Sequence, residues 1–143
     1  MRVKQVSVFL ENRAGRLDEV CELLGRRKIN IRALSLADTS DFGILRLIVN
    51  KPDEAYNALR KADFTTRFTE VIAVEIPDKP GGLASILKIF NEANLNVEYL
   101  YAFVEKRKEG AVVIFRLEEI DRAIGILQQK GVNLLTGEEV YKL

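Results

Sequence analysis

An internal repeat constrains the fold of this chain more than any other feature of its sequence. When the 143-residue chain is shifted by 66 positions, residues 6–34 fall on residues 72–100, and apolar positions coincide far more often than identical ones. Beyond this span the register slips by one or two residues. Two copies of one fold, with loops of different length, explain this pattern best. The identical pairs are Val8 and Val74, Gly15 and Gly81, Leu17 and Leu83, Asn30 and Asn96, and Leu34 and Leu100.

Each copy shows the same order of hydrophobic periods. Alternating apolar residues predict half-buried strands, and apolar spacings of three and four residues predict helices. In the first copy we expect strands at 3–10, 30–37, 42–49 and 64–69, a helix at 15–28 and a helix from Pro52 onward. In the second copy we expect strands at 71–76, 95–104 and 111–117, helices at 81–93 and 119–130, and an extended C-terminal segment.

This order of elements, βαββαβ in each copy, predicts the fold class. We expect an α+β protein with two ferredoxin-like domains, at residues 1–69 and 70–143, each with an antiparallel sheet and helices on one face. The pattern leaves open whether residues 64–76 form one continuous strand or two.

A glycine-containing junction joins the first strand to the first helix in each copy. The junctions read LENRAGRL at residues 10–17 and IPDKPGGL at residues 76–83. The first turn of a helix offers unpaired N–H groups and the positive end of its dipole, so such a junction suits a small anion. A nucleotide phosphate would need a longer glycine-rich loop with a Lys-Ser/Thr pair, so a carboxylate is the expected guest. The alternative is a plain turn in which Asn12 and Asp78 cap the helices.

Composition argues against several classes of function. Basic and acidic side chains number 22 and 21, a net charge of only +1, so the charge balance does not call for a nucleic-acid partner. The chain has no histidine and a single cysteine, which leaves no zinc site and no histidine base. We therefore expect no catalysis, no cofactor and no metal. The lone Cys21 suits a reducing cytoplasm, and no apolar run approaches the roughly 18 residues of a membrane span.

One strand of the second copy predicts self-association. Helices cover only one face of such a sheet, so an apolar row on the other face is expected to meet another sheet or subunit. We expect a homo-oligomer, with a dimer as its simplest form. The charged residues 105–109 that follow are expected to form a solvated turn. The two apolar rows are Val97, Tyr99, Tyr101 and Phe103, and Leu100, Ala102 and Val104.

The junctions belong to a longer motif. Asn12 and Asp78 are each followed 18 residues later by an asparagine that opens a strand, Asn30 and Asn96. The pattern Asn/Asp-x-Pro-Gly-x-Leu, an apolar helix, then Asn-Ile/Val resembles the ACT domain, and the resemblance covers nearly the whole chain as a tandem pair. ACT domains are βαββαβ modules that bind amino acids and related small ligands and regulate metabolic enzymes. The chain looks most similar to tandem ACT proteins that carry no fused enzyme.

The resemblance implies a role for each matching position. Asn12 and Asp78 would hydrogen-bond the amino group of a ligand, or a partner. Ligands of this family lie at the seam between two ACT domains, so the strand openings would reach a ligand held by a neighbouring domain. Those openings are Asn30-Ile31 and Asn96-Val97. The carboxylate would be received by Ala14, Gly15, Arg16 and Leu17 in the first copy and by Pro80, Gly81, Gly82 and Leu83 in the second.

Three positions depart from the family pattern. The first copy has Ala14 where the family usually has proline, and Arg16 after the glycine, which would either pair with a carboxylate or be solvated. The second copy has Asp78 in place of asparagine, which would repel a carboxylate and attract an ammonium group. The two copies are therefore expected to take different ligands, or to include one inactive site.

Three functions are compatible with a βαββαβ pair. The resemblance favours a non-catalytic regulatory protein that binds an amino acid and acts on a metabolic enzyme or regulator. The alternative is a docking or regulatory subunit, for example of an amino-acid biosynthesis enzyme, that binds no ligand. RNA-recognition modules share the βαββαβ order, but they need aromatic residues on the third strand, where only Phe115 is present.

Overall fold

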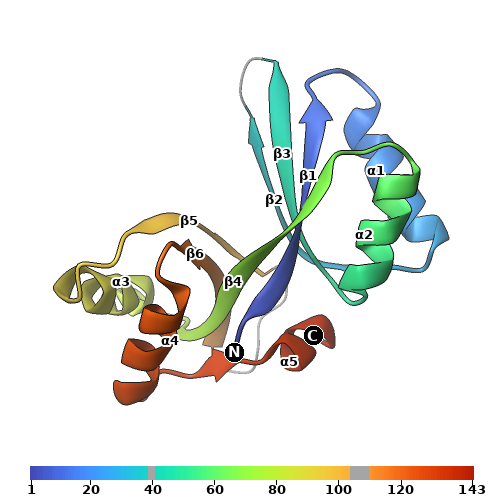
Figure 1. Ribbon diagram of the computed structural model, residues 1–143. Coiled ribbons are helices and arrows are strands. Elements are labelled where there is room, and N and C mark those ends of the chain that lie inside the picture. The colour runs from blue at the N-terminus through green and yellow to red at the C-terminus, as the bar shows by residue number, and fades with distance from the viewer. Residues whose placement is uncertain (39–40, 104–109) are drawn as a thin grey trace. The chain divides into compact units, whose positions relative to one another are not determined.

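The computed structural model describes residues 1–38, 41–103 and 110–143, and its elements follow the predicted order (Figure 1). It confirms an α+β fold made of two βαββαβ units. The charged run at 105–109 lies outside the described residues. The elements are β1 (Val3–Glu11), α1 (Arg16–Arg26), β2 (Ile31–Asp38), β3 (Phe42–Val49), α2 (Pro52–Lys61), β4 (Thr66–Pro77), α3 (Gly82–Glu92), β5 (Val97–Ala102), β6 (Gly110–Leu117), α4 (Ile120–Gln129), β7 (Leu134–Leu135) and α5 (Gly137–Tyr141).

The chain divides into two compact units. The first unit consists of Lys4–Thr69 with Tyr141–Leu143, and the second consists of Glu70–Val140 with Met1–Val3. Strands β1 and β4 therefore each contribute residues to both units. Each terminus belongs to the unit formed by the opposite half of the chain. No helix in the described part of the chain combines the length and apolar character that a membrane span requires.

The first unit builds its core on one face of an antiparallel sheet ordered β2-β3-β1-β4. Val6 and Val8 of β1 lie opposite Leu47 and Leu45 of β3, and all four are fully buried. Helices α1 and α2 lie together on one side of these strands (Figure 1) and bury Leu24 and Leu59, among others, against them. Burying such a side chain stabilises the fold by about 1.5–3 kcal/mol.

The second unit repeats this plan. Its sheet is ordered β4-β6-β5, and β7 pairs with β4 at Val74 and Ala73. Helices α3 and α4 supply Ile86, Phe90 and Leu127 to a core that includes Phe115 of β6. The rings of Phe90 and Phe115 meet edge to face, with centroids 5.3 Å apart at an angle of 75°. This geometry suits the quadrupoles of the two rings.

Strand β4 is continuous from Thr66 to Pro77, which answers the question that the sequence left open at residues 64–76. The segment contains no glycine and no internal proline that would interrupt a strand. The predicted strands at 64–69 and 71–76 are therefore one element that begins in the first unit and continues into the second.

A bulge in β5 changes the predicted rows of apolar side chains. The pairing of β5 with β6 shifts between Val97 and Tyr99, so Val97 packs against the core and does not share a row with Tyr99 and Tyr101. Leu100 lies opposite the core residue Phe115, which places the tyrosine row on the face away from the helices. Tyr101 is 8% exposed. Self-association through this row stays a prediction, and Val104 of the other row lies outside the described residues.

The prediction of an extended C-terminus was wrong beyond Leu135. Residues Gly137–Tyr141 form the short helix α5. The backbone N–H of Glu139 donates to Oγ1 of Thr136 at 3.2 Å, and Val140 is fully buried. Threonine followed three residues later by glutamate is a helix-start signature, so the signal was present in the sequence.

Tyr141, the last residue of α5, belongs to the first unit and is hydrogen-bonded at the beginning of that unit. The backbone N–H of Lys4 donates to the Tyr141 hydroxyl at 2.8 Å, and burial raises the pKa of Tyr141 above its ordinary value of 10.0. When the pKa of a group is higher in the folded state than in the unfolded state, the group contributes its whole stabilising free energy at pH values below the unfolded-state pKa. This contribution is lost as the pH rises through the folded-state pKa. The hydroxyl should therefore stabilise the protein at neutral pH and lose this effect in alkali.

Tyr141→Phe is expected to lower the free energy of unfolding at pH 7 by about 1 kcal/mol, because the Lys4 N–H loses its acceptor. Urea unfolding of both proteins at pH 7 and above pH 10 measures the effect. The difference in free energy of unfolding between the two proteins should become smaller as the pH rises, because the tyrosine ionises and phenylalanine cannot. A gap that is absent at pH 7, or that widens in alkali, would contradict the assignment.

Candidate functional site

The two glycine junctions share one pattern of backbone hydrogen bonds. In the β1–α1 loop the N–H of Arg13 donates to the carbonyl of Glu11, and in the β4–α3 loop the N–H of Lys79 donates to the carbonyl of Pro77. The next bonds also correspond: Arg16 N–H to Arg13 O and Gly82 N–H to Lys79 O, then Glu19 N–H to Gly15 O and Ser85 N–H to Gly81 O. All three pairs obey the 66-residue shift, so the repeat extends to individual backbone hydrogen bonds.

Glycine provides the backbone conformation at the start of each helix. Gly15 and Gly81 are the N-cap residues of α1 and α3, with φ of 92° and 85°, and neither helix has a side-chain cap hydrogen bond. Other residues rarely adopt this left-handed conformation. Glycine, and neither Asn12 nor Asp78, therefore occupies the N-cap position of each helix. Both residues lie three positions before the cap and are exposed.

Each loop leaves backbone donors at the helix start. The first N–H groups of α1 and α3, from Arg16 and Gly82, bond back to the loop. Those of the next residue in each helix, Leu17 and Leu83, have no backbone acceptor among the described residues. Leu17 is exposed and Leu83 is partly buried. A carboxylate placed over either helix start would meet such a donor and the positive end of the helix dipole.

Gly82 has a steric role that the sequence did not reveal. A Cβ atom at this position would lie 2.0 Å from the carbonyl oxygen of Pro77, which no side chain can tolerate. A Cβ at Gly81 or Gly15 would have no heavy atom within 4 Å. The first glycine of the Gly81-Gly82 pair is thus required by its φ angle, and the second by the close approach of two backbone segments.

Arg16 is turned toward its own unit. Its Nη1 lies 2.7 Å from Oε2 of Glu19, its guanidinium carbon lies 4.5 Å from the centre of the Phe64 ring, and its side chain is only 18% exposed. A solvated arginine does not fit this arrangement, and pairing of Arg16 with a ligand carboxylate stays a prediction. Glu19 follows Arg16 at the three-residue spacing of a helix and could have been anticipated. Phe64 is far away in the sequence and could not.

The strand-opening asparagines lie at the opposite ends of the helices from the loops. Asn30 follows α1, whose 11 residues span about 16 Å, and Asn96 follows α3 in the same way. The backbone of Asn30 is bonded to Asn50, which the sequence did not indicate: its N–H donates to Oδ1 of Asn50 at 2.8 Å, and its carbonyl accepts from the N–H of Asn50 at 3.1 Å.

Within each unit, the structure brings the predicted loop residues together and places the predicted strand-opening residues away from that loop. Residues 12–17 lie in one loop and the first turn of α1, and residues 78–83 lie in the other loop and the first turn of α3. Asn30 with Ile31, and Asn96 with Val97, stand apart from the loop of their own unit, and both asparagines are exposed. Their predicted ligand contacts stay predictions, as do those of the loop residues.

The aromatic residue that an RNA-binding function would need is not accessible. Phe115 is fully buried and packs edge to face on Phe90 in the core of the second unit. Its ring therefore cannot stack on a base, which is how sheets of this topology hold single-stranded RNA.

Comparison with known proteins identifies relatives along the whole chain. The family model described as ACT domain pair matches residues 1–143. The chain is similar to protein BT0572 from Bacteroides thetaiotaomicron, with 41% sequence identity, a TM-score of 0.94, and coverage of 100% of this chain and 98% of that one. No curated protein matches the sequence.

Two more distant structures share the fold. The regulatory subunit of aspartate kinase from Thermus thermophilus has a TM-score of 0.60 and 16% identity, covering 88% of this chain and 91% of its own. The corresponding subunit from Thermus flavus has a TM-score of 0.58 and 16% identity, with 88% and 90% covered. The fold of both units, the repeated loops and the family match over residues 1–143 agree. The chain therefore belongs to the ACT domain pair family.

Proposed function

We propose that this protein is a non-catalytic regulatory module that binds a small amino acid and modulates a metabolic enzyme. The observation that carries the proposal is the repeated loop, in which a left-handed glycine starts a helix and, among the described residues, the N–H of Leu17 or Leu83 has no backbone acceptor. The likeness to regulatory subunits of aspartate kinase concerns the fold, and it accords with a regulatory role.

The two loops offer different surroundings to a zwitterion. In the β4–α3 loop, helix amides would receive the carboxylate, and the exposed Asp78 carries the negative charge that an ammonium group needs. In the β1–α1 loop the corresponding residue is the neutral Asn12, and Arg16 is paired with Glu19. We therefore infer that the β4–α3 loop is the stronger amino-acid site of the two. That the ligand also touches a neighbouring domain stays a prediction.

Regulation would follow from linkage. A ligand shifts a conformational or binding equilibrium only by its difference in affinity for the two states. Micromolar binding corresponds to about 8 kcal/mol, which a helix start and a few polar side chains can supply to a small zwitterion. The part of this free energy that differs between the two states would bias binding of the partner enzyme.

A thermal-shift screen tests the proposal. The purified protein is heated with each of the twenty common amino acids and with branched-chain and aromatic keto acids at millimolar concentration. A saturable rise in Tm with one chemical class is expected, because a ligand bound only to the folded state stabilises it. No shift with any compound would instead favour the docking subunit that binds no ligand, which a pull-down from cell extract would then address.

The chain offers a matched pair of variants for locating the site. Gly81→Ala and Gly131→Ala each place a Cβ at a positive φ, 85° and 72°, with no heavy atom within 4 Å, so both should cost about 1–2 kcal/mol of stability. Gly81 lies in the β4–α3 loop, where the added methyl group would crowd a ligand on the α3 amides, whereas Gly131 lies in the turn between α4 and β7. The ligand-induced rise in Tm is expected to vanish in Gly81→Ala and to persist in Gly131→Ala. A full rise in Gly81→Ala would refute the loop as the site.

A further inference from the structure

Two exposed phenylalanines lie on the face of the first unit's sheet that the helices do not cover. Along β1 and β3, Val8 and Leu45 are turned toward the helices, so the alternation of a strand turns Phe9, Phe42 and Ile44 to the other face. Phe9 is 38% exposed and Phe42 is 57% exposed. Phe9 lies directly opposite Ile44, which makes Phe42 its diagonal neighbour, with Cα atoms about 7–8 Å apart.

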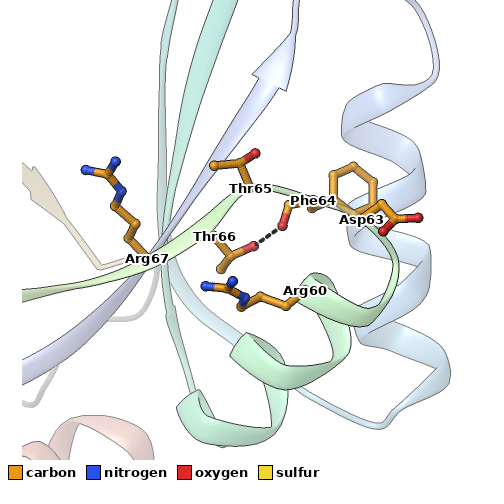
Figure 2. A pocket seen from close by; sticks show the side chains of 6 residues that line it. All are labelled: Arg60, Asp63, Phe64, Thr65, Thr66 and Arg67. Atoms are coloured by element: carbon orange, nitrogen blue, oxygen red, sulfur yellow. Dashed lines mark hydrogen bonds between the residues drawn. The ribbon is translucent and has the colours of Figure 1, made fainter.

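Strand β4 adds an arginine to this face. Thr66 is 2% exposed on the core side, so Arg67 and Thr69 are turned to the other side. The hydroxyl of Thr69 lies 3.1 Å from that of Ser7, which shares the open face with Phe9. The guanidinium carbon of Arg67 lies 5.9 Å from the centre of the Phe9 ring, and in Figure 2 its side chain points away from helix α2.

The charges at this end of the sheet leave Arg67 available to an anion. In the described ranges no ion pair joins Arg67 to a carboxylate, so its N–H donors can bind a further partner. Glu11, which lies opposite Phe42, would oppose an anion, but Arg13 pairs with it at 3.3 Å. We call Phe9, Phe42, Ile44 and Arg67 the aromatic platform.

The platform is limited to one end of the sheet. Gln5, Ser7 and Ile48 lie further along the same face, and each is 8% exposed or less. Nε2 of Gln5 donates to Oγ of Ser7 at 3.0 Å, so these polar groups are also engaged with each other. The exposed part of the face therefore suits a short ligand.

The platform has the features that Phe115 lacks. RNA-recognition modules of the same βαββαβ order stack two or three bases on aromatic residues of the sheet. Phe42, the first residue of β3, was overlooked when Phe115 was taken as the only aromatic residue on a third strand. Phe42 followed by Gly43 matches the aromatic-glycine step of their third-strand motif, with Ile44 in place of its next aromatic residue.

We propose that the aromatic platform binds single-stranded RNA, with bases on the rings of Phe9 and Phe42 and a phosphate on Arg67. Every base has a π-face that can stack on such a ring, and a guanidinium matches two phosphate oxygens. This ligand needs neither an ammonium nor a carboxylate group, so the proposal does not depend on the amino-acid site of the loops. A single phosphate contact predicts a weak salt dependence, with a slope of about −0.7 for the logarithm of the affinity against that of the salt concentration.

The test is titration of the full chain with a single-stranded RNA of four uridines, followed by two-dimensional amide NMR. Saturable shifts of the amides of residues 9, 42–44 and 67 are expected. Phe9→Leu and Phe42→Leu keep an apolar side chain but remove the ring, and each should weaken binding about fivefold or more. The matched control is Phe68→Leu, because Phe68 is 37% exposed in the same unit but stacks on Tyr56 of α2.

The phosphate contact is tested by a second pair of variants. Arg67→Gln should weaken binding and bring the salt slope close to zero. Arg60→Gln removes the same charge from α2, where Nη1 of Arg60 donates to the Tyr56 hydroxyl at 2.8 Å, and it should leave the salt slope unchanged. A fully paired RNA hairpin of the same concentration should not shift the platform amides, since its bases are already stacked on one another.

Four results would overturn the proposal. They are no saturable shift with the four-uridine strand, equal weakening by the three phenylalanine variants, equal affinity for the strand and for uridine monophosphate, and shifts of the platform amides that depend on protein concentration and are unaffected by RNA. The last result would assign the platform to a second copy of this chain. The spectra of the variants without RNA report whether their fold is intact.

Discussion

Replacing Gly82 with alanine is expected to destabilise the second unit by about 3 kcal/mol or more, a large effect for a single added methyl group. The added Cβ would overlap the carbonyl oxygen of Pro77 at 2.0 Å. Both atoms belong to backbone or are fixed directly to it, so no side-chain rotation can relieve the contact, and the β4–α3 loop must open. Urea unfolding monitored by circular dichroism measures the loss as a lower midpoint.

A control for this variant lies in the same unit. Gly125 lies within α4, and a Cβ there would meet no heavy atom within 4 Å. Gly125→Ala should therefore stabilise the protein by about 0.5–1 kcal/mol, because alanine loses less backbone entropy in a helix. If Gly82→Ala cost no more than Gly81→Ala, the close approach of loop and strand would be absent in solution. The ligand-induced rise in Tm should also be lost in Gly82→Ala, since the opened loop no longer holds the helix amides in place.

Phe90→Ala is expected to cost about 3–5 kcal/mol of stability, because it leaves a cavity in the core of the second unit. Phe90 is 1% exposed and packs on Phe115, so the variant loses both buried area and an edge-to-face ring contact. Denaturant unfolding measures the difference in free energy of unfolding between the variant and the wild type. An unchanged slope of this free energy against denaturant concentration would show that the unfolded state is unaffected.

Leu100→Ala is the matched control for Phe90→Ala. Leu100 lies on β5 of the same unit and is 39% exposed, so truncating it should cost about 1 kcal/mol or less. Equal losses in the two variants would mean that Phe90 is not in a close-packed core.

Most of the elements could be predicted because hydrophobic periods and turn residues are local signals. The strand at 42–49 was predicted with the bounds that the structure has, and the helices differ by one or two residues at their ends. The errors arose where pairing between strands overrides the local pattern. The bulge after Val97 places that side chain against the core. Strand pairing also made β4 one continuous strand, a point that the sequence had left open at residues 64–76. The helix α5 was missed although Thr136 and Glu139 mark its start.

The candidate site also has some features that the sequence predicts and others that only the folded structure shows. The repeat, the βαββαβ order and the glycines at the two helix starts were readable in the order of residues, because a positive φ and a hydrophobic period are properties of short segments. Folding alone settled two other matters: Arg16 lies on Phe64, and the backbone of Gly82 approaches the carbonyl oxygen of Pro77 too closely for a side chain. Each of these depends on where an element packs and on the distance at which it does so. That distance is set by the side chains filling the core, which no short segment of sequence contains.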